Sequence, residues 1–429
     1  MMDMLQTFFE TVSKLGAVVL LPVVIMLLGL FFRMRIGSAI KSGLLVGIGF
    51  QGLVLVLNLL MATINPVIAY YEKLGSGFTT IDVGFAAIGG AAWSIPAVVL
   101  CIPLIILLNI LLIKIKVVNV INVDVWNFIH FMIPGALAIA LFDNILIGVL
   151  VTISLSVITL FCAKWVAPKW EEYFGLEGTT CTTLAFVALI YPIAVFLNKV
   201  IDFIPFIKNL EINMDKIESK LGIFGDPTFI GIFVGAFLGI LTQQNIPTIL
   251  TICMGFAAVM ILIPRMVGIM MEGVTPIGNA ATTFIKKHVS GSDGKFYIGM
   301  DIALGLGDPA CITVTAITIP FVIAFAFLIP NMTFFPLGLL AQVCYLTPMI
   351  VLASKGNVFR STLLSIICMY FVCFSANYFA PEATAMMKYA GLDIFATNPN
   401  ATVTDGGHFG WNPGSILVSL MHRLIELFS

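Results

Sequence analysis

Charged residues are scarce in this chain, since Asp, Glu, Lys and Arg together make up only 10% of its 429 residues. An ordinary soluble domain carries roughly 25% charged residues, and a fold with far fewer could not cover its own surface in water. Hydrophobic residues make up 60% of the chain, and the mean hydropathy is +1.10. The bilayer must therefore be the solvent for most of the chain, and we expect an all-α polytopic membrane protein.

Motifs of soluble enzymes and metal sites are missing as well. The sequence contains no Walker A, HExxH or GxSxG motif, which argues against an ATP-driven pump. The eight cysteines form no CxxC pair and no metal-ligand spacing with histidine, so we interpret them as small apolar helix residues. A net charge of −1 gives no reason to expect nucleic acid as a partner. We expect no cofactor, no metal and no catalytic residue.

Apolar runs long enough to cross a bilayer recur along the chain, a helix needing about 20 residues to do so. The chain has room for about ten to twelve such spans. The clearest runs predict spans at 15–32, 42–63, 96–113, 144–163, 183–205, 227–241, 247–264, 309–329 and 360–380. Clusters of Lys and Arg between them predict cytoplasmic loops by the positive-inside rule, although the count of crossings leaves the orientation of both termini open.

Four further stretches are apolar but contain Gly, Pro, Asp or Asn: 80–95, 126–141, 297–308 and 335–354. Irregular backbone at membrane depth is tolerated only where it is buried in protein or lines a wet cavity. We interpret these stretches as re-entrant hairpins or discontinuous helices, with short kinked spans as the alternative.

An internal repeat is indicated by two of these stretches. "IDVGFAAIGGAAW", 81–93, and "MDIALGLGDPAC", 300–311, both place an Asp before small and apolar residues. The first follows a loop with few charges and the second follows a basic loop, so the two would enter the membrane from opposite faces. This pattern is typical of an inverted repeat, whose interface near the midplane is where transporters bind their substrate.

Polar side chains in apolar surroundings are the candidates for ligand contact, and we select Asp82, Asn127, His130, Thr182, Asp301 and Asp308. A dehydrated hydroxyl left unpaired costs about 1–3 kcal/mol, and carboxylate, amide and imidazole groups all pair with hydroxyls. The set therefore suits a small polyhydroxylated solute. A cation site would also use Asp and Thr.

Each candidate has a structural alternative that the sequence leaves open. Asp308 precedes Pro309 and can cap a helix that begins there, and Asp82 has a similar alternative. His130 can be a satisfied interior histidine. Trp126 can anchor the chain at the membrane interface or cover the C–H face of a sugar.

Several segments resemble the galactitol-type enzyme IIC permeases, the membrane components of bacterial phosphotransferase systems. They are "NVDVWNFIHF" (122–131), "GIFGDP" (222–227), "MILIPRMVGIMMEG" (260–273), "FYIGMDIALGLGDPA" (296–310) and "KGNVFRS" (355–361). The resemblance runs from about residue 5 to residue 390. Two segments, "GTTCTT" (178–183) and "TNPNATVTDGGHFGWNPGS" (397–415), depart from the pattern.

The resemblance implies a multi-pass homodimer in the bacterial cytoplasmic membrane. Each protomer would be one permease domain over 1–429, with repeat halves at 1–175 and 206–390 and a C-terminal tail at 391–429. A scaffold would hold a mobile core with two hairpins, which carries the solute across by an elevator-like shift. Asp301 and Asp308 match one hairpin motif and Asp82 matches the other.

The implied function is translocation of galactitol or a related polyol, coupled to its phosphorylation. A soluble IIB protein would donate the phosphoryl group from a cysteine, and a IIA protein would recharge IIB, so that the permease carries no phospho-residue itself. The alternative is an ion-coupled secondary transporter that uses Asp82 and Asp308 as cation or proton sites. A membrane scaffold without transport activity is a third hypothesis.

Overall fold

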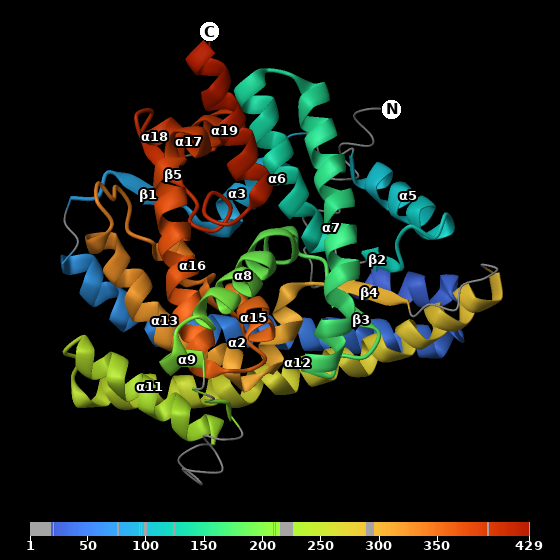
Figure 1. The fold of residues 1–429 in the computed structure, drawn as a ribbon, viewed down its shortest axis with the longest axis horizontal. Coiled ribbons are helices and arrows are strands. Elements are labelled where there is room, and N and C mark those ends of the chain that lie inside the picture. The colour runs from blue at the N-terminus through green and yellow to red at the C-terminus, as the bar shows by residue number, and fades with distance from the viewer. Residues whose placement is uncertain are drawn as a thin grey trace.

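The computed structural model describes residues 19, 21–74, 77–93, 95, 97, 101–122, 125–208, 210, 212–214, 226–288, 296–392 and 394–428. Helices predominate in these parts of the chain (Figure 1). Within them, five helices are long and apolar enough to cross a membrane: α2 (Ile36–Leu74), α7 (Ile145–Phe174), α12 (Ile246–His288), α13 (Pro309–Leu328) and α16 (Val358–Tyr378). The expectation of a helical, polytopic membrane protein is confirmed at this level.

Shorter apolar helices account for the other predicted spans. They cover 21–31, α5 (Cys101–Lys114), the π-helical turn η1 (Phe186–Ile190) with α8 (Tyr191–Ile201), and α11 (Pro227–Leu241). The predicted break at 126–141 is absent, because α6 (Val125–Phe142) runs through it as one helix with Pro134 inside. The expected irregularity does occur at 297–308, a strand followed by the 3-10 helix η3 (Ile302–Gly307), and at 335–354, where α14 (Leu337–Leu340) and α15 (Val343–Ala353) are separate.

Local sequence signals explain where several helices begin and end. The Asn144 side chain accepts hydrogen bonds from the backbone N–H groups of Leu146 and Ile147, which starts α7, and Gly175 ends it in the left-handed region at φ 66°. Asp226 and Asp308 cap α11 and α13 in the same way, each directly before a proline.

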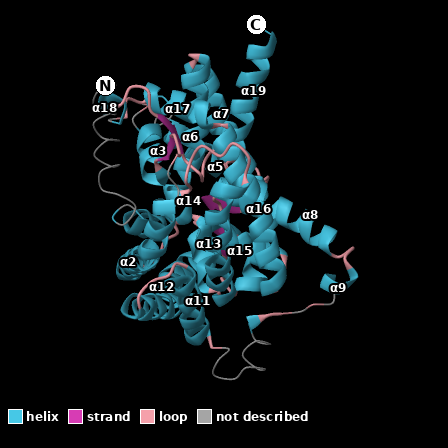
Figure 2. Ribbon diagram, turned by 90° about the vertical axis from the view of Figure 1, so that its left-hand side faces the viewer, coloured by secondary structure: helices cyan, strands magenta, loops and turns pink. Residues whose placement is uncertain are grey.

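The helices form a lower and an upper group, and between them lie the short strands together with α8, α13, α15 and α16 (Figures 1 and 2). Helices α2, α12 and α11 lie side by side in the lower layer of Figure 1. Glycines allow α2 and α12 to approach closely, since a Cβ at Gly49 would lie 2.7 Å from the backbone nitrogen of Met270. Such contacts are typical of helix packing in membranes, where small residues bring two backbones together.

The other layer contains α6, α7, α3 (Gly84–Trp93), α17 (Ala380–Tyr389) and α19 (Pro413–Phe428), which projects at the top of Figure 1. Two further short helices, α9 (Pro205–Lys208) and α18 (Ile394–Thr397), connect longer elements. Residues 401–419, which are part of the segment 391–429 that the sequence suggested as a tail, are largely buried against this layer.

Short parallel strands in the described residues form two sheets. Strand β4 (Tyr297–Met300) lies between β2 (Val120–Asn122) and β3 (Thr179–Cys181). Strand β1 (Thr80–Asp82) pairs with β5 (Thr402–Thr404) and also forms a bridge from Thr80 to Phe334. Both central strands lead directly to an aspartate, with Asp82 ending β1 and Asp301 following β4.

The order of elements in 21–201 recurs in 227–428. The helix over 21–31 is joined to α2 through Arg33 at φ 61°, and α11 is joined to α12 through Gln243 at φ 53°. Each long helix is followed by a central strand and its aspartate. The strands themselves are exchanged between the two series, because β2 and β3 pair with β4, whereas β5 and Phe334 pair with β1.

Candidate functional site

A cavity of about 460 Å³ lies where α2 faces the ends of the strands, a volume in the usual range for small-molecule sites. Phe50, Leu53, Val54, Asn58 and Leu60 line it from α2. The opposite side supplies aromatic rings and polar groups, which are Phe85, His130, Phe186, Asp301, Gln342, Tyr345, His408 and Trp411. The cavity therefore combines apolar faces with a few hydrogen-bonding groups from segments distant in the sequence.

Asp301 reaches the cavity from the end of β4, where it starts η3. Its Oδ1 accepts a hydrogen bond from the backbone N–H of Ala303 at 2.8 Å, and its Oδ2 lies 3.3 Å from the Thr183 hydroxyl. Each carboxylate oxygen can accept a further hydrogen bond. The carboxylate is therefore held in place by the protein and still has lone pairs for a ligand.

Asn127 and Thr182 are not among the described residues that line the cavity, and Asn127 is connected to Asp301 through Thr183. Asn127 is fully buried and donates from Nδ2 to the Thr182 hydroxyl at 2.9 Å, while its Oδ1 accepts from the Thr183 hydroxyl at 2.8 Å. Thr183 also accepts from the backbone N–H of Ile302 at 3.1 Å. This network fixes the strand end from which Asp301 projects.

His130 lines the cavity from α6 and is 6% exposed. Its Nδ1 lies 3.1 Å from Nε2 of His408, and the two rings stack with centroids 5.1 Å apart and planes at 20°. His408 Nδ1 is in turn 2.9 Å from Oδ2 of Asp405. The Phe85 ring lies beside both imidazoles, with centroids at 5.9 and 5.2 Å.

Asp82 and Asp308 are outside the cavity lining. Asp82 Oδ2 accepts from the backbone N–H of Leu339 at 2.9 Å, and its Oδ1 accepts from Gly84 at 3.3 Å and Gly406 at 3.4 Å. It thereby ties three chain segments together. Asp308 accepts from the backbone N–H of Ala310 at 2.7 Å as the cap of α13, which is the structural alternative considered for it.

Of the six residues selected from the sequence, the structure thus brings His130 and Asp301 to one cavity, with Asn127 and Thr182 in support. Sequence reasoning missed Asp405, His408, Gln342, Tyr345 and Trp411. A signal for Asp405 was present, because "TVTDGG" repeats the order of strand, Asp and small residues seen in "TTIDVG" and "IGMDIALG". Trp126 has no described side chain, so its two alternatives stay open.

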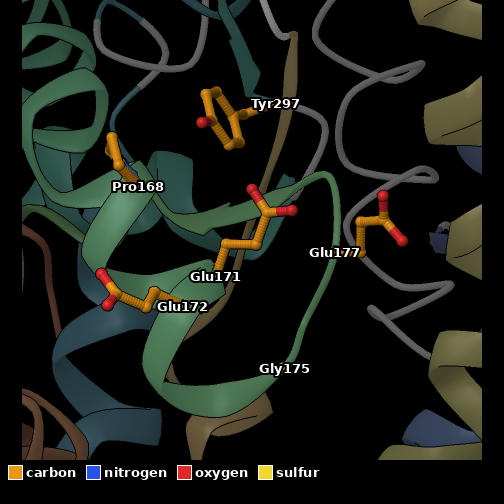
Figure 3. A pocket seen from close by; sticks show the side chains of 6 residues that line it. All are labelled: Pro168, Glu171, Glu172, Gly175, Glu177 and Tyr297. Atoms are coloured by element: carbon orange, nitrogen blue, oxygen red, sulfur yellow. The ribbon is translucent and has the colours of Figure 1, made fainter.

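A second cavity of about 520 Å³ lies at the C-terminal end of α7 (Figure 3). Glu171, Glu172 and Glu177 line it together with Pro168, Gly175 and Tyr297. Its described lining residues include three carboxylates, which would repel a phosphorylated ligand. The cavity beside α2 is the better candidate for a solute site.

Comparison with known proteins shows the family of the chain. The family model for the PTS system sugar-specific permease component matches residues 11–397. The galactitol-specific EIIC components of the phosphotransferase system in Escherichia coli K12 and in Escherichia coli O157:H7 are each 31% identical over 399 residues, covering 92% of this chain and 87% of the relative. A third protein, of Escherichia coli K12, provisionally named a permease IIC component, is 29% identical over 411 residues, covering 95% of this chain and 93% of that protein. The chain therefore belongs to the family of sugar-specific permease components of the phosphotransferase system.

Proposed function

We propose that this permease component translocates galactitol or a closely related polyol across the bacterial cytoplasmic membrane while the solute is phosphorylated. The observation that carries the proposal is the cavity that Asp301 and His130 both line. The galactitol specificity in the names of two relatives supports the choice of solute. The scarcity of charge along the described helices supports the membrane location.

The cavity has the groups that a polyol requires. A carboxylate accepts hydrogen bonds from two vicinal hydroxyls, and Asn58 can both donate and accept. Trp411 and Phe85 offer apolar faces for the C–H groups of the solute. Because both charges and hydroxyls are costly to leave unpaired in a dry site, such a lining favours a neutral, hydroxyl-rich molecule.

The recurring order of elements supports an inverted repeat, which we place at about 21–201 and 227–428. The cavity lies between α2, in the lower layer, and the strand ends that carry Asp301 and His408. In an elevator-type mechanism, the layer of α2, α11 and α12 would form one body and the strand-bearing layer the other. The solute would move together with the strand-bearing layer, because that layer contributes most of the polar side chains that line the cavity.

Phosphoryl transfer to the solute depends mainly on positioning and on neutralising charge. The permease would present one hydroxyl to a phosphocysteine of a soluble IIB protein, itself recharged by IIA, while no residue of the permease becomes phosphorylated. A carboxylate within reach of that hydroxyl would accept its proton. A homodimer is the expected assembly.

Reconstituted vesicles provide the test. Proteoliposomes that contain the chain are supplied with labelled galactitol, phosphorylated IIB and a regenerating system based on phosphoenolpyruvate. We expect labelled galactitol phosphate to form only when IIB is present. Uptake of unmodified galactitol that is driven by a proton or sodium gradient without IIB would instead establish the ion-coupled alternative.

A further inference from the structure

Three side chains from distant parts of the chain form one hydrogen-bonded series that ends at the cavity. Asp405 follows β5, His408 lies three residues later, and His130 lies on α6. Asp405 Oδ2 is 2.9 Å from His408 Nδ1, and His408 Nε2 is 3.1 Å from His130 Nδ1. The side chains of Asp405 and His408 are 0% and 1% exposed, so bulk water cannot replace either contact.

The first contact determines where His408 carries its hydrogen. Besides the imidazole, Asp405 accepts from the backbone N–H of His408 at 2.7 Å and from Nε2 of Gln342 at 3.1 Å. Because these two N–H donors point at both of its oxygens, we take Asp405 as ionised, a form that only accepts hydrogen bonds. His408 Nδ1 is therefore the protonated nitrogen.

The second contact passes this constraint to His130. We take His408 as the tautomer that carries its single hydrogen on Nδ1, and such an imidazole is an acceptor at Nε2. His130 must then donate from Nδ1, which leaves its own Nε2 without a hydrogen. Within the described part of the chain, no protein group is hydrogen bonded to that nitrogen, and His130 lines the cavity.

We propose that Asp405 and His408 are positioning residues that set the tautomer of His130, so that its Nε2 faces the cavity as an acceptor for a ligand hydroxyl. The nitrogen that is protonated in a histidine depends on the hydrogen bond made by the other nitrogen. Asp405 therefore sets the tautomer of His408, and His408 in turn sets the tautomer of His130. Only the identity of the ligand as a polyol rests on the proposed function. The tautomers follow from the contacts of the protein itself.

Nitrogen NMR of the reconstituted full chain measures the tautomers directly. The chain has only four histidines, and a His288→Gln, His422→Gln variant leaves the two of interest. With ¹⁵N-labelled histidine we expect both remaining rings to be protonated at Nδ1 and bare at Nε2. A ring protonated at Nε2, or at both nitrogens, would overturn the assignment.

The positioning role is tested by His408→Phe, which keeps His130 and the ring packing against Phe85 but removes the acceptor for His130 Nδ1. We expect His130 to shift toward the Nε2–H form and galactitol binding to weaken by about five- to tenfold, the effect of one lost hydrogen bond. His408→Gln, whose amide oxygen can again accept from His130, should restore both. Unchanged binding in His408→Phe with His130 in the Nε2–H form would contradict the acceptor role.

Experiments on the wild-type chain distinguish a failure of the proposed solute from a failure of the positioning role. If it binds no galactitol in the calorimetric titration, the proposed solute is wrong, whereas the NMR tautomers still decide the positioning role. If it binds galactitol and the tautomers differ from those expected, the function stands and the role of Asp405 and His408 is refuted.

Discussion

At the scale of single residues, two aspartates that both cap a helix differ in whether they also line the cavity. Asp301 and Asp226 both accept a hydrogen bond from the N–H two residues later, and an asparagine can still do so through its side-chain oxygen. Only Asp301 also lines the cavity. Replacing each of them by asparagine therefore separates capping from ligand contact.

We expect Asp301→Asn to weaken galactitol binding by about ten- to hundredfold, because a hydrogen bond to a charged group contributes about 1.5–3 kcal/mol. Asp226→Asn should bind as the wild type does. Isothermal titration in detergent compares the two variants, and equal affinities for both would remove Asp301 from the site. The same titration with Asp308→Asn tests whether that residue does more than cap α13.

Thr183 offers a second residue-scale prediction. Its hydroxyl contacts Asn127 Oδ1, Asp301 Oδ2 and the N–H of Ile302. Thr183→Val keeps the shape of the side chain but leaves these buried groups unpaired, at a cost of about 1–3 kcal/mol per group. We expect a lower thermal unfolding temperature together with weaker galactitol binding. Thr251→Val, at an exposed threonine whose hydroxyl donates only to the backbone of its own helix, is the control, and a similar loss there would contradict a specific role for the Thr183 network.

At the scale of elements, the close approach of α2 and α12 depends on glycine. A Cβ at Gly49 would meet the Met270 side chain at 2.4 Å and its backbone nitrogen at 2.7 Å, whereas a Cβ at Gly37, on the same helix, would meet nothing within 4 Å. We expect Gly49→Ala to lower the unfolding temperature, and Gly37→Ala to raise it slightly because alanine favours helix by about 0.5–1 kcal/mol. Thermal unfolding followed by circular dichroism measures both, and equal effects would mean that the helices can separate without cost.

The elements also show how far sequence reasoning reaches. Hydropathy located the spans because lipid requires about 20 apolar residues in a row. It gave α2 only as 42–63, whereas the helix begins at Ile36 and continues to Leu74 with Pro66 inside it. Asp301 and His130 were detectable as polar residues in apolar surroundings. His408 was not, because its segment is polar in sequence and becomes buried only through the pairing of β5 with β1.

At the scale of the whole molecule, the C-terminal segment completes both the fold and the cavity. It supplies β5, Asp405, His408 and Trp411. We expect a chain that ends at residue 390 to lose galactitol binding, whereas a chain that ends after Arg423 should keep it, because the residues beyond are exposed and Arg423 retains its ion pair with Glu382. Binding by the shorter chain would contradict the site described for this protein.

The exchange of strands between the two halves has a consequence for biosynthesis. Thr80 pairs with Thr402, and β2 pairs with β4, so neither half of the chain contains the partners for its own central strand. The early helices can enter the membrane as they leave the ribosome, but β1 must wait until almost the entire chain has been translated. Contacts between such distant positions form slowly. The cavity beside α2 is therefore among the last features to assemble, and a nascent chain released before residue 402 would lie in the membrane without it.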